Sequence, residues 1–325
     1  MVAVGASVIP QAAEAKARNF FVDLIVRLVK EKPLGTLGGG IVLVLVLTGI
    51  FADVLAPYGY KAYILADKLA PPSARHILGT DNIGRDQLSR IIYGARISLI
   101  VGLAGAALDT LVATVIGITS GFAGRKVDII VQRFVDAWMC FPSLFLYLTV
   151  MTVLGPGLLQ VVLVLGISSG IRSSRVVRSA VIGIKENLYV AAAIAVGAPT
   201  RWILLRHVLP NVMAPIIIIF TVGMGGMILQ EATLSFLGFG IPPPVPSWGG
   251  MLSGPGRQYM IEAPWMALWP GLALSIVVYG INMLGDGVRD ILDPRLRGGL
   301  GRYSGMAIKR EKILRKAEAK PRPLS

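Results

Sequence analysis

Long stretches of uncharged, apolar residues limit what this chain can fold into more than any other feature. The first lies between Lys32 and Asp53 and contains 20 residues without a charge. A helix of about 20 apolar residues is long enough to cross the roughly 30 Å hydrocarbon core of a bilayer. The sequence therefore predicts an all-α integral membrane protein with six transmembrane helices. We expect these helices at about residues 35–54, 97–121, 134–154, 158–176, 209–231 and 264–285.

The third and fourth of these spans share one long apolar region. Residues 137–171 contain no Asp, Glu, Lys, Arg or His. The sequence Gly155-Pro156-Gly157 interrupts this region, and Pro and Gly together favour a turn. We therefore expect a helical hairpin, with a kink at Pro142 in its first arm.

The charges of the chain support a membrane protein. Hydrophobic residues make up 54% of the sequence and charged residues 15%, whereas a soluble domain carries roughly 25% charged residues. The net charge of +14 is compatible with anionic lipid or with nucleic acid as a partner. The basic residues flank the predicted spans, where anionic lipids attract them, and no aromatic-basic stacking pattern occurs. We expect a multi-pass protein of the cell membrane, in contact with the lipid bilayer and with no nucleic-acid partner.

The distribution of Lys and Arg predicts the orientation of the chain. The termini and the connections expected on the same side hold 25 basic residues, and the opposite side holds 7. Because basic residues favour the inside, both termini should be cytoplasmic. Residues 1–34 then form a cytoplasmic or interfacial segment, with a membrane-surface helix and no removable signal peptide. Residues 35–290 form the transmembrane domain, residues 57–93 an extracytoplasmic loop that is more basic than the rule favours, and residues 291–325 a basic cytoplasmic tail.

The connection between the fourth and fifth spans is predicted to be structured. Residues 185–196 contain good helix formers, and Gly197 is suited to end that helix in the left-handed conformation. Pro199 suits the first turn of a second helix that closes near Pro210. We expect a rigid helix–turn–helix on the cytoplasmic face and call residues 185–210 the lever. The alternative is an amphipathic hairpin that floats at the membrane interface.

Glycines and acidic residues in two other regions predict structural roles. Gly79-Thr80-Asp81 and Gly84-Arg85-Asp86 favour tight turns in which the acidic side chains accept backbone N–H groups. A calcium loop is not indicated, because a closing Glu is absent. Small residues at a four-residue spacing predict close helix packing in the membrane. These residues are Gly117 with Gly121 and Gly166 with Gly170.

Three acidic residues lie inside the predicted spans. Asp109 is in the middle of the second span, Asp136 is early in the third, and Glu231 is at the outer end of the fifth. A charge at the bilayer centre costs about 2.5–3.5 kcal/mol on insertion scales, so each residue should face the bundle or water. Asp109 and Glu231 either border a translocation path or make polar contacts between helices.

Several motifs resemble those of a known family. Ala191-Ala192-Ala193, Gly197 and His207-Val208-Leu209-Pro210 resemble the EAA loop of ATP-binding-cassette importer permeases. The segment 76–90 resembles the region after the first span in the dipeptide, oligopeptide and nickel permease group. The segments 231–238, 243–249 and 282–297 resemble later signatures of that group. Together these motifs cover roughly residues 35–297 and indicate the "C" member of a permease pair.

The resemblance implies a type I importer permease fold in which the lever docks into a cleft on an ATPase subunit. The lever residues expected to carry this coupling are Glu186, Tyr189, Ala191, Ala192, Gly197, Pro199, His207 and Pro210. The implied partners are a homologous "B"-type permease, two ATP-binding-cassette ATPase subunits and an extracytoplasmic solute-binding protein. Ala191 departs from the family pattern, which has an acidic residue at this position.

No catalytic or metal centre is predicted. One Cys and two His exclude a disulfide framework and a His/Cys metal cluster made by this chain alone. No phosphate-binding loop of the form G-x-x-x-x-G-K-[ST] occurs in the sequence. We therefore expect a transporter subunit that is not an enzyme and binds no cofactor, with ATP and Mg on the partner ATPases.

The resemblance implies import of di- or oligopeptides, with nickel complexes or glutathione-like solutes as alternatives. A stand-alone secondary transporter or a non-transporting membrane scaffold are the alternatives from other classes. A secondary transporter would need an acidic relay in the membrane, and it would leave the structured lever unexplained.

Overall fold

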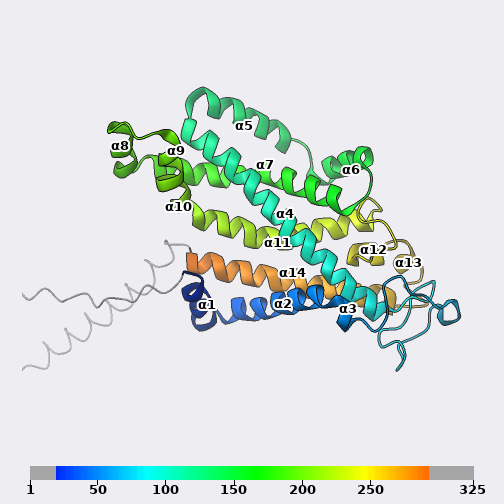
Figure 1. The fold of residues 1–325 in the computed structure, drawn as a ribbon. Coiled ribbons are helices and arrows are strands. Elements are labelled where there is room, and N and C mark those ends of the chain that lie inside the picture. The colour runs from blue at the N-terminus through cyan, green and yellow to red at the C-terminus, as the bar shows by residue number, and fades with distance from the viewer. Residues whose placement is uncertain (1–19, 293–325) are drawn as a thin grey trace, which may run out of the picture.

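The computed structural model describes residues 20–292, and all helices and turns in this range form one elongated bundle (Figure 1). Its long helices are α2 (Pro33–Ile50), α4 (Gln87–Ala123), α7 (Leu158–Lys185), α11 (Met213–Phe236) and α14 (Trp265–Leu292). Two shorter helices, α5 (Arg125–Met139) and α6 (Ser143–Leu154), lie on the α4 and α7 side of the bundle. Within the described residues no strand forms, which confirms the predicted all-helical class.

Short helices cover the two ends of the bundle (Figure 1). One end, which we call the lever end, carries α1 (Phe20–Glu31), α8 (Leu188–Ala195), α9 (Thr200–Ile203), η2 (Leu204–Val208) and α10 (Leu209–Asn211). The opposite end carries the remaining short helices. These are α3 (Ala52–Leu55), η1 (Leu65–Asp67), α12 (Trp248–Leu252) and α13 (Gly254–Gln258).

Four single helices of the described chain are long and apolar enough to cross a membrane: α2, α4, α11 and α14. They lie at four of the expected spans, 35–54, 97–121, 209–231 and 264–285. Helix α4 begins at Gln87, inside the loop expected over 57–93. At the position of the fourth predicted span lies α7, which continues to Lys185 instead of ending near residue 176. Its arginines keep it from qualifying as a span by hydropathy.

The third predicted span, 134–154, is not one kinked helix. The chain forms α5 from Arg125 and then α6, and the axes of these two helices differ by 88°. The break falls at Pro142, which lacks a backbone N–H and disfavours a helical conformation in the preceding residue. Together, α5 and α6 have the length and hydropathy of one broken span.

Helices α4 and α7 are in close contact through the predicted glycines. A Cβ atom on Gly117 would lie 2.6 Å from Val177 Cβ, and one on Gly170 would lie 2.5 Å from Val112 Cβ. Gly121 and Gly166 meet the opposing helix in the same way. The four-residue spacing therefore marks close packing, as the sequence predicts.

A second glycine contact joins α2 to α14. A Cβ atom on Gly38 would lie 2.4 Å from the carbonyl oxygen of Gly280. At the lever end of this pair, Lys32 Nζ contacts Asp290 Oδ2 at 2.6 Å. The first and last long helices are thereby held side by side, as Figure 1 shows.

The two glycine-acid motifs before α4 form the predicted turns. Gly79 and Gly84 have φ angles of +77° and +81°. Asp81 Oδ1 accepts the backbone N–H groups of Ile83 and Arg85, and Asp86 caps α4 by accepting the N–H of Ser89 at 2.8 Å. This part of the loop is therefore ordered by its own side chains.

Helix α1 confirms the helix expected before the first span. The basic tail expected over 291–325 lies outside the described residues, apart from its first two positions. The segment before Phe20 also lies outside them.

Replacing Gly170 with Val should lower the melting temperature of the purified protein in detergent. The added side chain has no room against Val112, and overpacking of this kind costs about 1–3 kcal/mol. The matched control is Gly183→Val in the same helix, where nothing lies within 4 Å of an added Cβ among the described residues. Equal melting temperatures for the two variants would contradict the close α4–α7 contact.

Candidate functional site

The lever is anchored to the bundle by a hydrophobic cluster of its own. Val190 and Ala193 of α8, with Ile203 and Val208 of the following turns, are buried against the rest of the chain. The bundle contributes residues of α4, α7 and α11 and the α11 N-cap residue Val212 to this cluster. These residues are Ala113, Val177, Val181, Val212 and Ile216. The lever is therefore packed onto the bundle, and the alternative of a floating hairpin does not fit the structure.

Gly197 ends α8 as predicted. Its φ angle is +77°, which a residue with a Cβ adopts only with strain. The Ala198 N–H donates to the Ala193 carbonyl at 3.1 Å, and the Gly197 N–H donates to the Ile194 carbonyl at 3.0 Å. This pair of bonds is the Schellman arrangement that closes a helix at a left-handed glycine.

The helices of the lever differ in detail from the prediction. Lys185 belongs to α7, and its ammonium group donates to the Phe122 carbonyl at 2.6 Å, so α8 begins only at Leu188. The chain breaks at Glu186 and Asn187, and the Asn187 amide donates to the carbonyls of Gly183 and Ile184. The end of α7 is thus closed by a side chain, which helix propensity alone does not reveal.

The second part of the lever is not a uniform α-helix. Pro199 is the N-cap of α9, and residues Leu204–Val208 form a π-helical turn before α10. The Leu209 N–H donates to Leu204 across this wider turn, and Pro210 follows it. Because Pro210 has no N–H to donate, a widened turn accommodates it without a broken hydrogen bond.

The face of the lever that points away from the bundle is apolar. Leu188 is 88% exposed and Val196 is 83% exposed, and the other exposed apolar side chains are those of Tyr189, Ile194, Trp202 and Leu205. Arg201 and Arg206 border a hollow next to Trp202 and Leu205. An exposed apolar surface with basic residues at its edge is typical of a protein–protein contact.

His207 connects the two parts of this exposed surface, which lie before and after Gly197. The His207 ring lies 4.8 Å from the Trp202 ring and 5.9 Å from the Tyr189 ring, measured between centroids. Tyr189 and His207 were both predicted to belong to the coupling loop, and the structure brings them together. Their contact links α8 to the π-helical turn across the Gly197 bend.

The remaining predicted lever residues also lie on this part of the structure. Glu186, Ala191, Ala192, Pro199 and Pro210 are exposed. Leu188, Trp202 and Leu205 also belong to this exposed surface, although the sequence motifs do not single them out. The sequence does contain a sign of this exposed surface, because the short lever helices are apolar on two faces. Only one face can pack against the bundle, so the other must be exposed.

The acidic residues of the second and fifth spans are buried in this chain. Asp109 is enclosed where α4 meets α7 and α11, beside Ser173 and Gly223, and its Oδ1 atom has no hydrogen-bond partner among the described residues. Glu231 is 1% exposed, and its Oε1 atom accepts the Ser235 hydroxyl at 2.6 Å. These positions favour polar contacts inside the bundle over a direct place on a translocation path.

Asp136 has different surroundings. It lies on α5 with its side chain 43% exposed, and it forms an ion pair with Arg175 of α7. Arg133 lies 3.7 Å from its other carboxylate oxygen. Because Arg175 comes from a distant part of the sequence, the pairing shows why an acidic residue is tolerated here.

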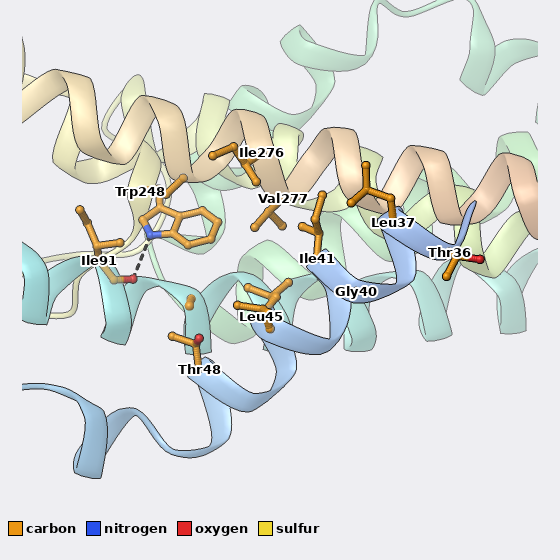
Figure 2. A pocket seen from close by; sticks show the side chains of 13 residues that line it. Thr36, Leu37, Gly40, Ile41, Leu45, Thr48, Ile91, Trp248, Ile276 and Val277 are labelled. Carbon is orange, nitrogen blue, oxygen red and sulfur yellow. Dashed lines mark hydrogen bonds between the residues drawn. The ribbon is translucent and has the colours of Figure 1, made fainter. Parts of the chain in front are cut away.

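An apolar groove opens between α2 and α14 near Trp248 (Figure 2). The side chains of Ile41, Leu45 and Val277 point into it, and the Trp248 indole N–H donates to the Ile91 carbonyl at 3.1 Å. Its only other polar lining groups in the described chain are the hydroxyls of Thr36 and Thr48. The groove suits a hydrocarbon chain or an apolar helix and offers little to a polar solute.

Comparison with known proteins identifies relatives over most of the chain. Residues 113–298 match the family described as binding-protein-dependent transport system inner membrane component. Residues 21–72 match the N-terminal transmembrane domain of oligopeptide transport permease C.

Three relatives show the range of the similarity. The dipeptide transport system permease protein of Alkalihalophilus pseudofirmus is 40% identical, over 82% of this chain and 88% of the relative. The oligopeptide transport system permease protein of Bacillus subtilis is 37% identical, over 87% and 92%. The glutathione transport system permease protein of Pectobacterium atrosepticum is 38% identical, over 80% and 86%.

Replacing Glu231 with Ala should destabilise the protein, because it removes a buried side chain and leaves the Ser235 hydroxyl without its acceptor. We expect a loss of about 2 kcal/mol or more, measured as a lower unfolding midpoint in detergent. Thr233→Ala, on the same helix but with an exposed hydroxyl, is the control. An unchanged unfolding midpoint for Glu231→Ala would contradict its role as a contact inside the bundle.

Proposed function

Because this chain belongs to the binding-protein-dependent transport system inner membrane components, we propose that it forms the peptide pathway of an ATP-driven importer. It is a multi-pass protein of the cytoplasmic membrane and a transport permease subunit, not an enzyme. Its cargo is di- or oligopeptides, as the names of its relatives suggest. The observation that carries the proposal is the exposed apolar lever, which is anchored to the bundle and bent at Gly197.

In this proposal the chain crosses the membrane six times. To the four spans that hydropathy identifies, the broken pair α5 and α6 adds one and α7 adds another. The arginines of α7 are compatible with a span because Asp128 and Asp136 neutralise two of them. Arg178 Nε donates to Asp128 Oδ1 at 2.6 Å, and Arg175 pairs with Asp136. The fold is then that of a type I importer permease.

We place the lever end on the cytoplasmic side. The start of α1, the end of α14 and the lever lie at this end (Figure 1). This arrangement agrees with the excess of basic residues in the same segments, which favours the inside of the cell. The segments 56–86 and 237–264 then face the outside.

The lever couples the bundle to two ATP-binding-cassette ATPases, which bind ATP and Mg. Its exposed apolar side chains enter a cleft on one ATPase subunit, and Arg201 and Arg206 meet acidic groups at the rim. When ATP closes the ATPases, the levers of this chain and of a "B"-type permease move together. Closure shifts the pair between inward-open and outward-open states because the ATPases contact these states differently.

A solute-binding protein delivers the cargo to the end opposite the lever. At this end the proline-rich segment 242–246 turns at residues 243–244 and leads to α12, and we assign it as a ledge near the pore mouth. A glutathione-like cargo is the alternative that one relative supports, since glutathione is itself a modified tripeptide. Nickel complexes are a further alternative within the group.

Two measurements test this function. Purification in mild detergent followed by mass spectrometry should recover two ATPases, a second permease and a solute-binding protein with this chain. Uptake of labelled peptide into vesicles should stop when the ATPase is inactivated but continue with an uncoupler. Uptake by the purified chain alone would instead indicate a secondary transporter, and no uptake of any solute would indicate a scaffold.

Replacing Gly197 with Val should uncouple ATP hydrolysis from uptake while the protein still inserts into the membrane. Val at a φ of +77° is strained by about 1–2 kcal/mol, so the lever loses its fixed angle. The measurement is the number of peptides imported per ATP hydrolysed in vesicles.

Gly155→Val provides a matched control at the opposite end of the bundle. Gly155 has a φ of +80° and, like Gly197, no neighbour within 4 Å of an added Cβ in the described structure. It should leave the coupling ratio unchanged. A normal ratio in Gly197→Val would refute the mechanism.

Replacing Ala191 with Glu should be tolerated, because residue 191 is exposed and the new carboxylate restores the acidic residue of the family motif. We expect the same amount of ATPase to copurify, and uptake within about twofold of wild type, as for most surface substitutions. Loss of the ATPase from the purified complex would show that the docking surface lies elsewhere.

A further inference from the structure

A small polar pocket lies at the end of the bundle opposite the lever. Residues 81–90, at the start of α4, form one wall, and residues 243–266 form the other. Its volume is about 130 Å³, enough for a single carboxyl group with the atoms next to it. The polar side chains that line it include Arg85, Gln87, Arg90 and Ser253.

Arg90 is buried in this pocket without a complete set of partners. It is 7% exposed, and its Nη1 atom has no hydrogen-bond partner in the described part of the chain. The nearest acidic group is Asp81, whose Oδ2 atom lies 3.8 Å from Arg90 Nε. At that distance the two groups attract each other but do not form a hydrogen bond.

Asp81 is occupied by other donors. Its Oδ1 atom accepts two backbone N–H groups, and its Oδ2 atom accepts Arg85 Nε at 2.5 Å. The next acidic residue, Asp86, accepts from Ser89 and contacts His76 Nδ1 at 2.9 Å. The pocket therefore holds two guanidinium groups and one carboxylate, with a positive charge left over.

Gln87 places an unused acceptor in the same pocket. It is buried, and its Oε1 atom has no hydrogen-bond partner within residues 20–292. Its amide nitrogen faces the Met266 carbonyl at 3.5 Å. Buried polar groups without partners are costly, so a free donor and a free acceptor in one pocket indicate a ligand that supplies both matching groups.

We propose that this pocket binds the terminal carboxylate of the peptide cargo. The carboxylate accepts hydrogen bonds from Arg90, and the amide N–H next to it donates to Gln87. The C-terminal residue of a peptide offers an anionic acceptor and an adjacent donor in this order. The inference rests on the proposed function and adds to it a group on this chain that recognises the cargo.

A carboxylate could also reach this end on the solute-binding protein. The pocket favours the cargo because it is small and also presents an acceptor, which an Asp or Glu side chain would leave unpaired. The test must therefore distinguish binding of the cargo carboxylate from docking of the solute-binding protein.

The test compares uptake of trialanine and trialanine amide by the complete importer in vesicles, with excess binding protein. Arg90→Gln should lower uptake of trialanine about tenfold, the loss expected for a buried hydrogen bond to a charged group, and leave the amide little changed. The wild-type importer and the Arg90→Gln importer use the same binding protein. Any preference of that protein for one of the two peptides therefore cancels when the importers are compared. Arg75→Gln, an exposed arginine at the same end, is the control.

A second variant covers the case in which Arg90→Gln does not assemble. Asn82→Trp should close the pocket from its half-exposed rim while Arg90 stays in place, and it should show the same selective loss of trialanine uptake. Equal uptake ratios for the two peptides in wild type and in both variants would overturn the proposal. Weaker docking of the empty binding protein to Arg90→Gln would also overturn it, because the pocket would then bind that protein. If the wild-type importer takes up neither peptide, the proposed function itself fails.

Discussion

The close contact of α4 and α7 is the interaction on which the rest of the structure depends. Gly117 and Gly170 let the two helices approach until side chains of one touch the backbone of the other. The same two helices also supply the cluster that holds the lever, through Ala113, Val177 and Val181. A force on the lever is therefore applied to the centre of the bundle, since packed interiors transmit strain with little compression.

The two ends of the bundle have different chemistry. The lever end presents apolar side chains and arginines on an exposed surface, which suits a protein partner. The opposite end has a compact loop, held by the hydrogen bonds of Asp81 and Asp86, and a small pocket with buried polar groups. This division matches a permease that is driven from one side and receives its cargo on the other.

The buried polar groups of the chain fall into two kinds. Asp86 is buried with partners on nearby residues, His76 and Ser89, and it holds the start of α4 in place. Asp109 and Arg90 are also buried, but each keeps an atom without a hydrogen-bond partner in the described chain. A buried polar group without a hydrogen bond costs free energy. A conformational change or a ligand that supplies the missing hydrogen bond therefore gains most at these positions. Among the described residues, none that lines the apolar groove beside Trp248 has a buried side-chain polar atom without a hydrogen-bond partner (Figure 2).

The sequence by itself determined the features that depend on local chemistry. Hydropathy located four helices that are long and apolar enough to cross a membrane. Gly197 located the end of α8, and the spacing of the glycines in α4 and α7 located the helix contact. The tertiary structure alone decided how far α7 extends, how sharply the chain bends at Pro142, and that Asp136 pairs with Arg175. It also decided that Arg90 is buried beside Gln87. The physical reason is that the cost of a charge or a bend depends on partners from distant helices, which are absent from the local pattern of residues.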